Sequence, residues 1–161
     1  MQYLICENEK PLIHVSSGQL LNEENFKHPR RNLDTWVIII CIKGKLYIAQ
    51  DNRYYTLTEN QYLILFSGHE HFGFKECEKD LSYYWCHFRI SENVKYKIMK
   101  NDELTQVFDT KDNVLDTFPT GNHISRYCIL PEFGDISANG RATLIFRQLL
   151  DLARNDHYSD M

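Results

Sequence analysis

The stretch that decides the fold class is Thr35–Gln50, TWVIIICIKGKLYIAQ. Its first half, Thr35–Ile42, is rich in β-branched residues and predicts a buried strand, because such side chains pack well on a pleated surface. Lys43-Gly44 is a turn signal, and Lys45–Gln50 then places alternate side chains on two faces, as a strand does. The stretch therefore predicts two strands joined by a short turn.

Short strand patterns separated by turn residues continue on both sides of this stretch. They are predicted at Leu12–Ser16, Arg53–Leu57, Tyr62–Phe66, Leu81–Ile90 and Cys128–Leu130. Further turn signals stand at Asp51-Asn52 and Glu59-Asn60. Turn signals that recur about every 8–12 residues are typical of an antiparallel sandwich or barrel, whereas a parallel sheet needs longer crossover connections. The sequence therefore predicts a mainly β fold. Residues 95–111 show no clear period, and Asn113–Tyr127 is interpreted as a long loop.

After Pro131 the pattern changes from strands to a helix that ends near Arg154. Ser137 or Asn139 is a suitable N-cap residue. The apolar stripe of this helix consists of Ala142, Ile145, Phe146, Leu149, Leu150, Leu152 and Ala153. A stripe of this width can pack on the chain's own β-structure or against a second subunit, and the pattern leaves both possibilities open.

Composition limits the classes of function. The chain has 161 residues, enough for one domain with a core, and a net charge of −4. Its basic cluster, Lys27–Arg31, is offset by nearby acidic residues, so the chain by itself is not expected to bind DNA. Five cysteines without a C-x-x-C pair indicate free thiols in a reducing cytoplasm. Met1–Lys10 lacks the apolar core of a signal peptide, and no apolar run reaches the ~20 residues that span a bilayer.

The strand pattern Leu81–Ile90, LSYYWCHFRI, carries the clearest candidate site. Successive side chains on a strand point to opposite faces. One face holds Leu81, Tyr83, Trp85, His87 and Arg89, and the other holds Ser82, Tyr84, Cys86, Phe88 and Ile90. The first face combines aromatic rings with hydrogen-bonding groups, as the wall of a pocket for a small polar molecule does. The alternative is that these are core residues whose polar atoms bond internally.

His69-Glu70-His71 is the clearest metal-binding pattern, because residues i and i+2 of a strand point the same way. Glu76 follows at a spacing seen in metal-binding β-barrels, and His87 is a further candidate ligand. The alternative is a turn between Gly68 and Gly73 in which the two histidines occur by chance. Nucleophilic catalysis has little support, since no G-x-S-x-G elbow and no glycine-rich phosphate loop is present.

The order of these segments resembles the amino-terminal domain of AraC-type transcription regulators. The matching segments are Thr35–Tyr47, Glu59–Gly73, Tyr83–Phe88, Ile129–Asp135 and Thr143–Ala153. The resemblance implies a cupin-like antiparallel β-barrel, or jelly roll, followed by a C-terminal α-helix. It implies an effector-binding barrel with an N-terminal arm over residues 1–135 and a dimerisation helix region over residues 136–161. It also implies that His71 lies in a barrel turn and needs no metal.

The resemblance further implies a set of residues that line the effector pocket. These ligand-binding candidates are His28, Arg31, Lys43, Phe72, Tyr83, Trp85 and His87. Trp85 would stack on the ligand, Lys43 would donate to a hydroxyl or carboxylate, Tyr83 would hydrogen-bond, and Phe72 would form a second apolar wall. Lys43 and Phe72 stand where the arabinose sensor of the family has Arg and Tyr, so arabinose itself is not expected.

The sequence therefore predicts a non-enzymatic, cytoplasmic sensor of a small polar effector, expected to be a sugar, with no cofactor. It is expected to form a homodimer through its C-terminal helix. DNA would be bound only by helix-turn-helix units, which we expect on a longer chain than the residues up to Met161. The alternative is a metal-dependent cupin enzyme, an isomerase or dioxygenase, with His69, His71 and Glu76 as metal ligands.

Overall fold

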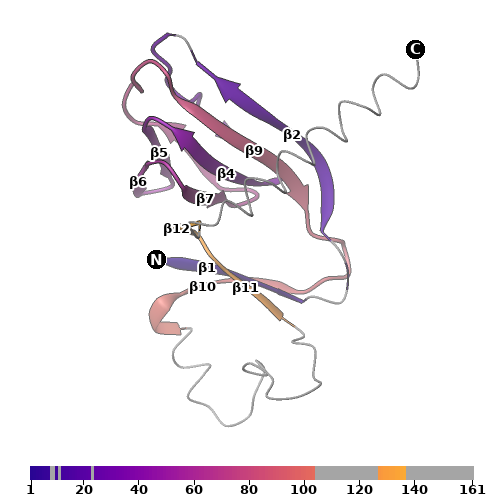
Figure 1. Ribbon diagram of the computed structural model, residues 1–161. Coiled ribbons are helices and arrows are strands. Elements are labelled where there is room, and N and C mark those ends of the chain that lie inside the picture. Colours follow the sequence, from indigo (N-terminus) through magenta and orange to yellow (C-terminus); the bar gives the residue numbers. More distant parts are fainter. Residues whose placement is uncertain (8–9, 11, 23, 104–126, 137–161) are drawn as a thin grey trace, which may run out of the picture. The chain divides into compact units, whose positions relative to one another are not determined.

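The computed structural model describes residues 1–7, 10, 12–22, 24–103 and 127–136 (Figure 1). The described chain is mainly β, and the strand pairs with a determined register are antiparallel, which confirms the predicted fold class. The strands are β1 (Gln2–Glu7), β2 (Ile13–Leu21), β3 (Arg31–Asn32), β4 (Trp36–Lys43), β5 (Leu46–Gln50), β6 (Arg53–Leu57), β7 (Gln61–Leu65), β8 (Glu70–Gly73), β9 (Ser82–Arg89), β10 (Tyr96–Lys100), β11 (Tyr127–Pro131) and β12 (Phe133–Asp135).

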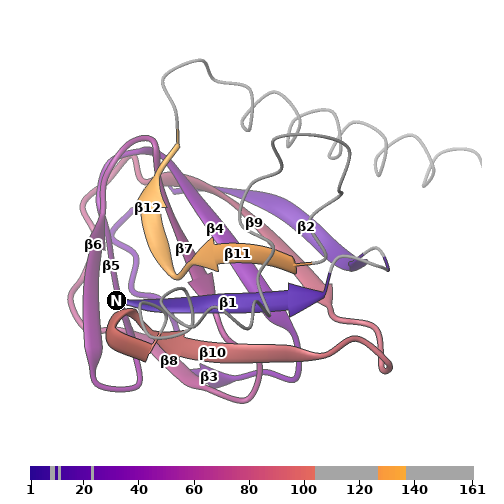
Figure 2. The same cartoon turned by 90° about the horizontal axis from the view of Figure 1, so that it is seen from below.

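The strands belong to two compact units. Unit 1 comprises the described residues of Met1–Ile13 and Arg89–Phe133, and unit 2 comprises those of His14–Phe88 and Gly134–Met161. In unit 1 the order of strands is β10-β1-β11, with β1 in the middle (Figure 2). The buried Ile5 of β1 packs against Tyr3, Met99 and Ile129.

Unit 2 contains two sheets. Their strand orders are β12-β7-β4-β9-β2 and β3-β8-β5-β6, and Figure 1 shows β4, β9 and β2 running side by side. Gln50 at the end of β5 links the two sheets, because its Nε2 donates to the Ile64 carbonyl and its Oε1 accepts from the Phe66 amide. Gln50 is fully buried, so these bonds satisfy a side chain that would otherwise be costly to remove from water.

Strand β4 is buried on both faces. Ile38, Ile40 and Ile42 pack on one side in a cluster that includes Tyr84 of β9 and Ile136. The alternate residues of β4 lie on the opposite face, where the sheet borders the interior of unit 2. The unbroken apolar run of the sequence is therefore that of a central strand covered on both sides.

The turns that the sequence predicted between these strands are present. Gly44, Asp51 and Asn60 have positive φ values of 81°, 50° and 65°, the left-handed conformation that Gly, Asn and Asp tolerate best. They lie at the β4–β5, β5–β6 and β6–β7 connections. The predicted turn signals at these three connections are confirmed.

Several strands of the structure were not predicted from the sequence. Gln2–Glu7 and Tyr96–Lys100 are strands β1 and β10, although the sequence pattern gave no signal for either. Both sit in the three-stranded sheet of unit 1, where pairing with distant segments rather than local alternation determines the structure. The Gly68–Gly73 region, predicted as a turn, contains the short strand β8.

The predicted C-terminal helix over residues 141–154 and most of the predicted loop over 113–127 lie outside the described residues. Within the described ranges, no helix is both long enough and apolar enough to cross a bilayer.

Candidate ligand-binding cavity

Unit 2 contains a cavity of about 310 Å³. This volume is at the small end of the range usual for ligand pockets. Both sheets and the segment that joins β2 to β3 contribute to its wall. The lining residues are Leu20, Phe26, His28, Pro29, Arg31, Leu33, Val37, Ile39, Leu65, His71, Tyr83, Trp85 and His87.

One wall of the cavity is built on the central strand β4. Val37 is paired with Leu65 of β7 on one side and with His87 of β9 on the other. Ile39 is paired with Trp85. Directly opposite residues of an antiparallel pair share a face, so the ladder alone brings these side chains together. This wall is largely apolar, with the β9 side chains adding aromatic and polar groups.

Trp85 is packed closely against β2. A Cβ atom placed on Gly18 would lie 2.5 Å from Cζ2 of the Trp85 indole, so a larger residue at position 18 would displace the ring. The sequence prediction ended the first strand before Gly18, whereas β2 continues through it to Leu21. Gly18 therefore lies within the strand, and the Trp85 indole occupies the space that a larger side chain at this position would need.

His87 is oriented by a buried hydroxyl. Its Nδ1 lies 2.8 Å from Oγ1 of Thr35, and its ring meets the Trp85 ring edge-on with centroids 5.4 Å apart. Thr35 is buried just before β4. The hydrogen bond and the ring contact together limit the rotation of His87 in the cavity wall.

The opposite part of the wall carries basic side chains. Arg31 of β3 is paired directly with His71 of β8, and the rings of His28 and His71 have centroids 5.4 Å apart. His71 is only 2% exposed, and within the described chain its Nδ1 makes no hydrogen bond. Arg31, His28 and His71 thus form a basic cluster, named here the Arg31 cluster.

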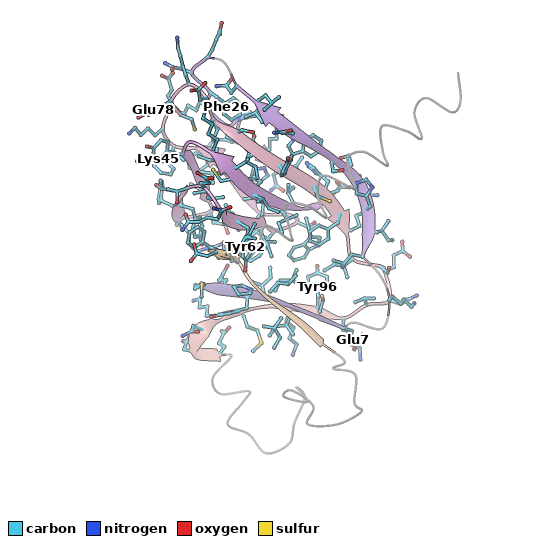
Figure 3. The ribbon with its side chains drawn as sticks, in the orientation of Figure 1. Glu7, Phe26, Lys45, Tyr62, Glu78 and Tyr96 are labelled. Atoms are coloured by element: carbon cyan, nitrogen blue, oxygen red, sulfur yellow. The ribbon has the colours of Figure 1, made fainter. Side chains whose placement is uncertain are left out.

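The chain geometry around Gly73 positions His28. The Gly73 amide donates to the His28 carbonyl at 2.8 Å, and the Cys77 amide donates to the Phe26 carbonyl at 2.7 Å. A Cβ on Gly73 would lie 2.6 Å from the His28 nitrogen, so only glycine allows this approach. Figure 3 shows Phe26 at the end of unit 2 that also carries Lys45 and Glu78, with Tyr62 at the other end.

Burial keeps the histidines of the cavity uncharged at neutral pH. Burial lowers the pKa of His28 to about 4, and the positive charge of Arg31 acts in the same direction. The pKa values of His71 and His87 are also lowered, chiefly by burial and further by Arg31. Burial raises the pKa of Tyr83 to about 12. The cavity therefore presents neutral donors and acceptors beside one permanent cation, Arg31.

Five of the residues predicted to bind the effector line this one cavity. They are His28, Arg31, Tyr83, Trp85 and His87. Tyr83, Trp85 and His87 lie on one face of β9, while Tyr84 and Cys86 pack in the cluster on the other face. The geometry brings the five together, and their role in binding stays a prediction.

Lys43 lies outside the cavity. The register of β4 with β9 shifts between Cys41 and Lys43, so that Lys43 stands opposite Ser82, on the face that points away from the cavity. Its Nζ lies 3.3 Å from Oδ2 of Asp80, and both side chains are largely exposed. The β-bulge therefore removes Lys43 from the face that simple alternation would give it.

Phe72 also lies outside the cavity. It follows His71 on β8, and neighbouring residues of a strand point to opposite faces. The Arg30 guanidinium lies 3.9 Å from the centre of the Phe72 ring. Phe72 lines an open hollow on this outer side together with Tyr54 and Phe74.

Sequence reasoning missed several residues of the wall. It considered His71 only as a metal ligand or turn residue, and it did not separate Val37 and Ile39 from the rest of the apolar run. The pairing of Val37 with His87 would have identified them, but register is not visible in a single strand. Leu20 and Phe26 lie on segments that no periodic pattern marks.

The alternative metal site is not assembled. His69 Nδ1 lies 2.8 Å from Oδ2 of Asp51, outside the cavity lining that contains His71. Glu76 is exposed. In the part of the chain that the structure describes, no three or more His, Cys, Asp or Glu side chains form a group that could hold a metal ion.

The chain belongs to the AraC-like ligand-binding domain family, whose profile matches residues 14–97, just over half of the chain. The described part of the matched range in unit 2 contains the whole cavity lining. A ligand-binding domain of an AraC-type regulator is therefore the class of protein that fold, cavity and family define.

One curated relative is the Bacillus subtilis (strain 168) protein named uncharacterized HTH-type transcriptional regulator YisR. It is 28% identical over 76 residues, which are 47% of this chain and 26% of the relative. The chain thus matches about a quarter of that regulator's length.

Solved structures share only a low overall similarity. ToxT from Vibrio cholerae, solved with an unsaturated fatty acid, has a TM-score of 0.36 and 12% identity, over 88% of this chain and 44% of ToxT. A Ralstonia eutropha JMP134 protein described as a candidate mannose-6-phosphate isomerase has a TM-score of 0.39 and 9% identity, over 50% of this chain and 84% of that one. Similarities at this level do not define a function.

Proposed function

We propose that the cavity of unit 2 is the effector site of a transcription regulator and that its effector is a small polar metabolite, such as a sugar or sugar derivative. The observation that carries the proposal is the convergence of His28, Arg31, Tyr83, Trp85 and His87 on one small cavity. Pockets for small molecules commonly combine apolar walls with a few polar groups in this way.

The proposed role of each residue follows from its chemistry. Trp85 offers an apolar surface on which the C–H face of a ring can stack. Tyr83 and His87 provide hydrogen bonds that orient the ligand, and His87 is already held by Thr35. His28 and Arg31 come from the β2–β3 side and contact the ligand from across the cavity.

Occupancy is proposed to act on the segment between β2 and β3. Phe26, His28 and Pro29 of this segment line the cavity, so a bound ligand would stabilise its packed position. We propose that this change is passed to the N-terminal arm, to a homodimer formed through the helix predicted after residue 136, and to DNA-binding units on a longer chain. In this scheme the domain acts as a non-catalytic, cytoplasmic sensor.

The test is a binding screen on the wild-type chain and its Trp85→Ala variant. Hexoses, pentoses, sugar acids and small carboxylates are titrated by calorimetry and by the shift in melting temperature. A ligand of the cavity should raise the melting temperature of the wild type, because it binds only the folded state, and lose most of this effect in Trp85→Ala. The Trp36→Phe variant is the control, since Trp36 is buried outside the cavity lining.

A ligand whose affinity is unchanged in Trp85→Ala would contradict the assignment of the site. Dimerisation is tested separately by sedimentation of the wild type and of Leu149→Asp, which places a charge in the predicted apolar stripe. Identical sedimentation of the two chains would contradict a dimer formed through this helix.

A further inference from the structure

The cavity has a one-sided distribution of charge. Its polar lining residues are one arginine, three histidines and one tyrosine, and the described lining contains no Asp or Glu. Arg31 has no ion-pair partner among the described residues, and its charge reaches His28, His71, His87 and Tyr83. The site therefore offers a cation and several hydrogen-bond donors, with no acid to balance them.

Acidic groups on β8 and at the end of β5 are already paired with other side chains. Glu70 adjoins His71 on β8, but its carboxylate is paired with Arg30, which lies over Phe72 on the other side of the strand. Asp51 is likewise engaged with His69 and Arg53. Consecutive arginines thus have different surroundings, with Arg30 paired and Arg31 facing the cavity.

We propose that the effector carries a carboxylate and that the Arg31 cluster binds it, while the apolar wall of Val37, Ile39 and Trp85 receives the rest of the molecule. The inference rests on the proposed function, since it names the chemical class of effector for the same cavity. A guanidinium can hold a carboxylate through two parallel hydrogen bonds, which a neutral hydroxyl cannot accept. His71, with its buried unpartnered Nδ1, supplies a further polar group at this position.

The size and lining of the cavity restrict the ligand further. A volume of about 310 Å³ accommodates a single small ring or short chain. Eight of the thirteen lining residues are apolar, and the basic groups come chiefly from β3, β8 and the β2–β3 segment. The matching ligand is a small carboxylate with one polar end, such as a hexuronic acid or an aromatic monocarboxylate.

Binding of an anion would also draw protons into the cavity. A carboxylate beside His28, His71 or His87 favours the charged imidazolium and so raises pKa values that burial and Arg31 hold low. The groups that face these rings are Arg31 from β3, Tyr83 from β9 and Glu70, whose charge is paired with Arg30. Affinity for a carboxylate should therefore rise as the pH falls from 8 to 6.

The experiment uses pairs of ligands that differ only in the anionic group. Glucuronate and galacturonate are compared with glucose and galactose, benzoate with benzamide, and glucose 6-phosphate with glucose. Calorimetry on the wild-type chain should detect at least one carboxylate that binds about tenfold or more tightly than its neutral partner. The sugar and aromatic pairs distinguish the two sources of the carboxylate.

The variants Arg31→Gln and Arg30→Gln form a matched set at consecutive positions. Arg31→Gln should weaken carboxylate binding about tenfold or more and remove the preference over the neutral partner, while Arg31→Lys recovers part of it. Arg30→Gln should leave the affinity unchanged. Melting curves of the three variants verify that each is folded.

Each outcome decides the proposal. Equal affinity for acid and neutral partner, or binding of the acid that survives Arg31→Gln, overturns the carboxylate and leaves the effector site itself intact. Preference for glucose 6-phosphate over every carboxylate, or absence of binding by all carboxylates of the panel, also overturns it. A ligand whose affinity is unchanged in Trp85→Ala contradicts the proposed function instead, because that ligand then binds outside the cavity.

Discussion

The two sides of strand β8 differ although their residues are neighbours in the sequence. His71 and Arg31 face the cavity, whereas Phe72 and Arg30 lie on the outer side, where Arg30 covers the Phe72 ring and pairs with Glu70. The outer pair is already complete as an ion pair and a cation–π contact. The inner pair combines a charge with a buried ring that lacks a partner at Nδ1. The neighbouring residues Phe72 and His71 thus belong to different environments: Phe72 to a surface contact whose groups are already paired, and His71 to a cavity wall that can accept a ligand.

The largest effect is expected from removal of the Gln50 side chain, which links the two sheets of unit 2. Gln50→Ala removes the side chain that bonds Ile64 and Phe66, leaves two buried backbone groups unsatisfied and opens a void. We expect a loss of about 2–4 kcal/mol in the free energy of unfolding, measured by urea denaturation. Gln61→Ala is the control, because its bond to Asp135 is exposed and the bonds that it accepts from Thr58 are only part-buried, so it should cost markedly less. Equal losses would contradict the role of Gln50.

The second largest effect is expected from a substitution that disturbs only the cavity wall. Gly18→Val places methyl groups in the space of the Trp85 indole, so the ring must move. We expect a destabilisation of about 1–3 kcal/mol, together with loss of effector binding. Gly18→Ala should have the same effects at smaller size. If Gly18→Val bound the effector as the wild type does, the packing of Trp85 on β2 would not matter for the site.

A third prediction uses the pH dependence of folding. The folded-state pKa values of His28, His71 and His87 lie below 6.5, the ordinary value of a histidine, so protons bind more strongly to the unfolded chain. The stability contributed by these uncharged rings is present above pH 6.5 and falls as the pH drops from 6.5 towards 4. Thermal melts over this range should show a shallower decline in His28→Gln than in the wild type. His14→Gln, at an exposed position outside the cavity, is the control substitution.

The smallest effects belong to the residues that the structure places outside the cavity. Lys43→Ala removes an exposed ion pair with Asp80 and should change stability by roughly 0–1 kcal/mol. Phe72→Ala removes an outer aromatic contact with Arg30. Both variants should bind effector with unchanged affinity in the calorimetric screen. A tenfold loss of effector affinity in either variant would show that the substituted residue does contribute to binding.

These contrasts explain how far sequence alone could go. Local chemistry and the alternation of side chains predict the mainly β class of the fold and the turns at Gly44, Asp51 and Asn60. They also predict which face of Leu81–Ile90 carries Trp85. Strands β1 and β10 do not, because each is defined by pairing with a distant partner.

The errors at the site have the same origin. Lys43 was assigned to the pocket by its place in the family pattern. A β-bulge between Cys41 and Lys43, which no residue type predicts, places Lys43 on the opposite face of the strand. Phe72 was also assigned by its place in the family pattern, whereas its neighbour His71 is the residue of β8 that lines the cavity, opposite Arg31 in the β3–β8 register. Arg31 and His28 could be named but not brought together with His71 until the pairing of their segments was known.

The most direct test of the effector cavity compares the two tryptophans of the chain. Trp85 lines the cavity, whereas Trp36 packs between Phe66 and Phe88 outside its lining. The chain is labelled with 5-fluorotryptophan, the ¹⁹F resonances are assigned with Trp36→Phe, and the sugars, sugar acids and small carboxylates of the screen are added. A binding ligand should shift the Trp85 resonance and leave that of Trp36 in place. A ligand that binds without moving the Trp85 resonance, or that moves only Trp36, would contradict the cavity as the effector site.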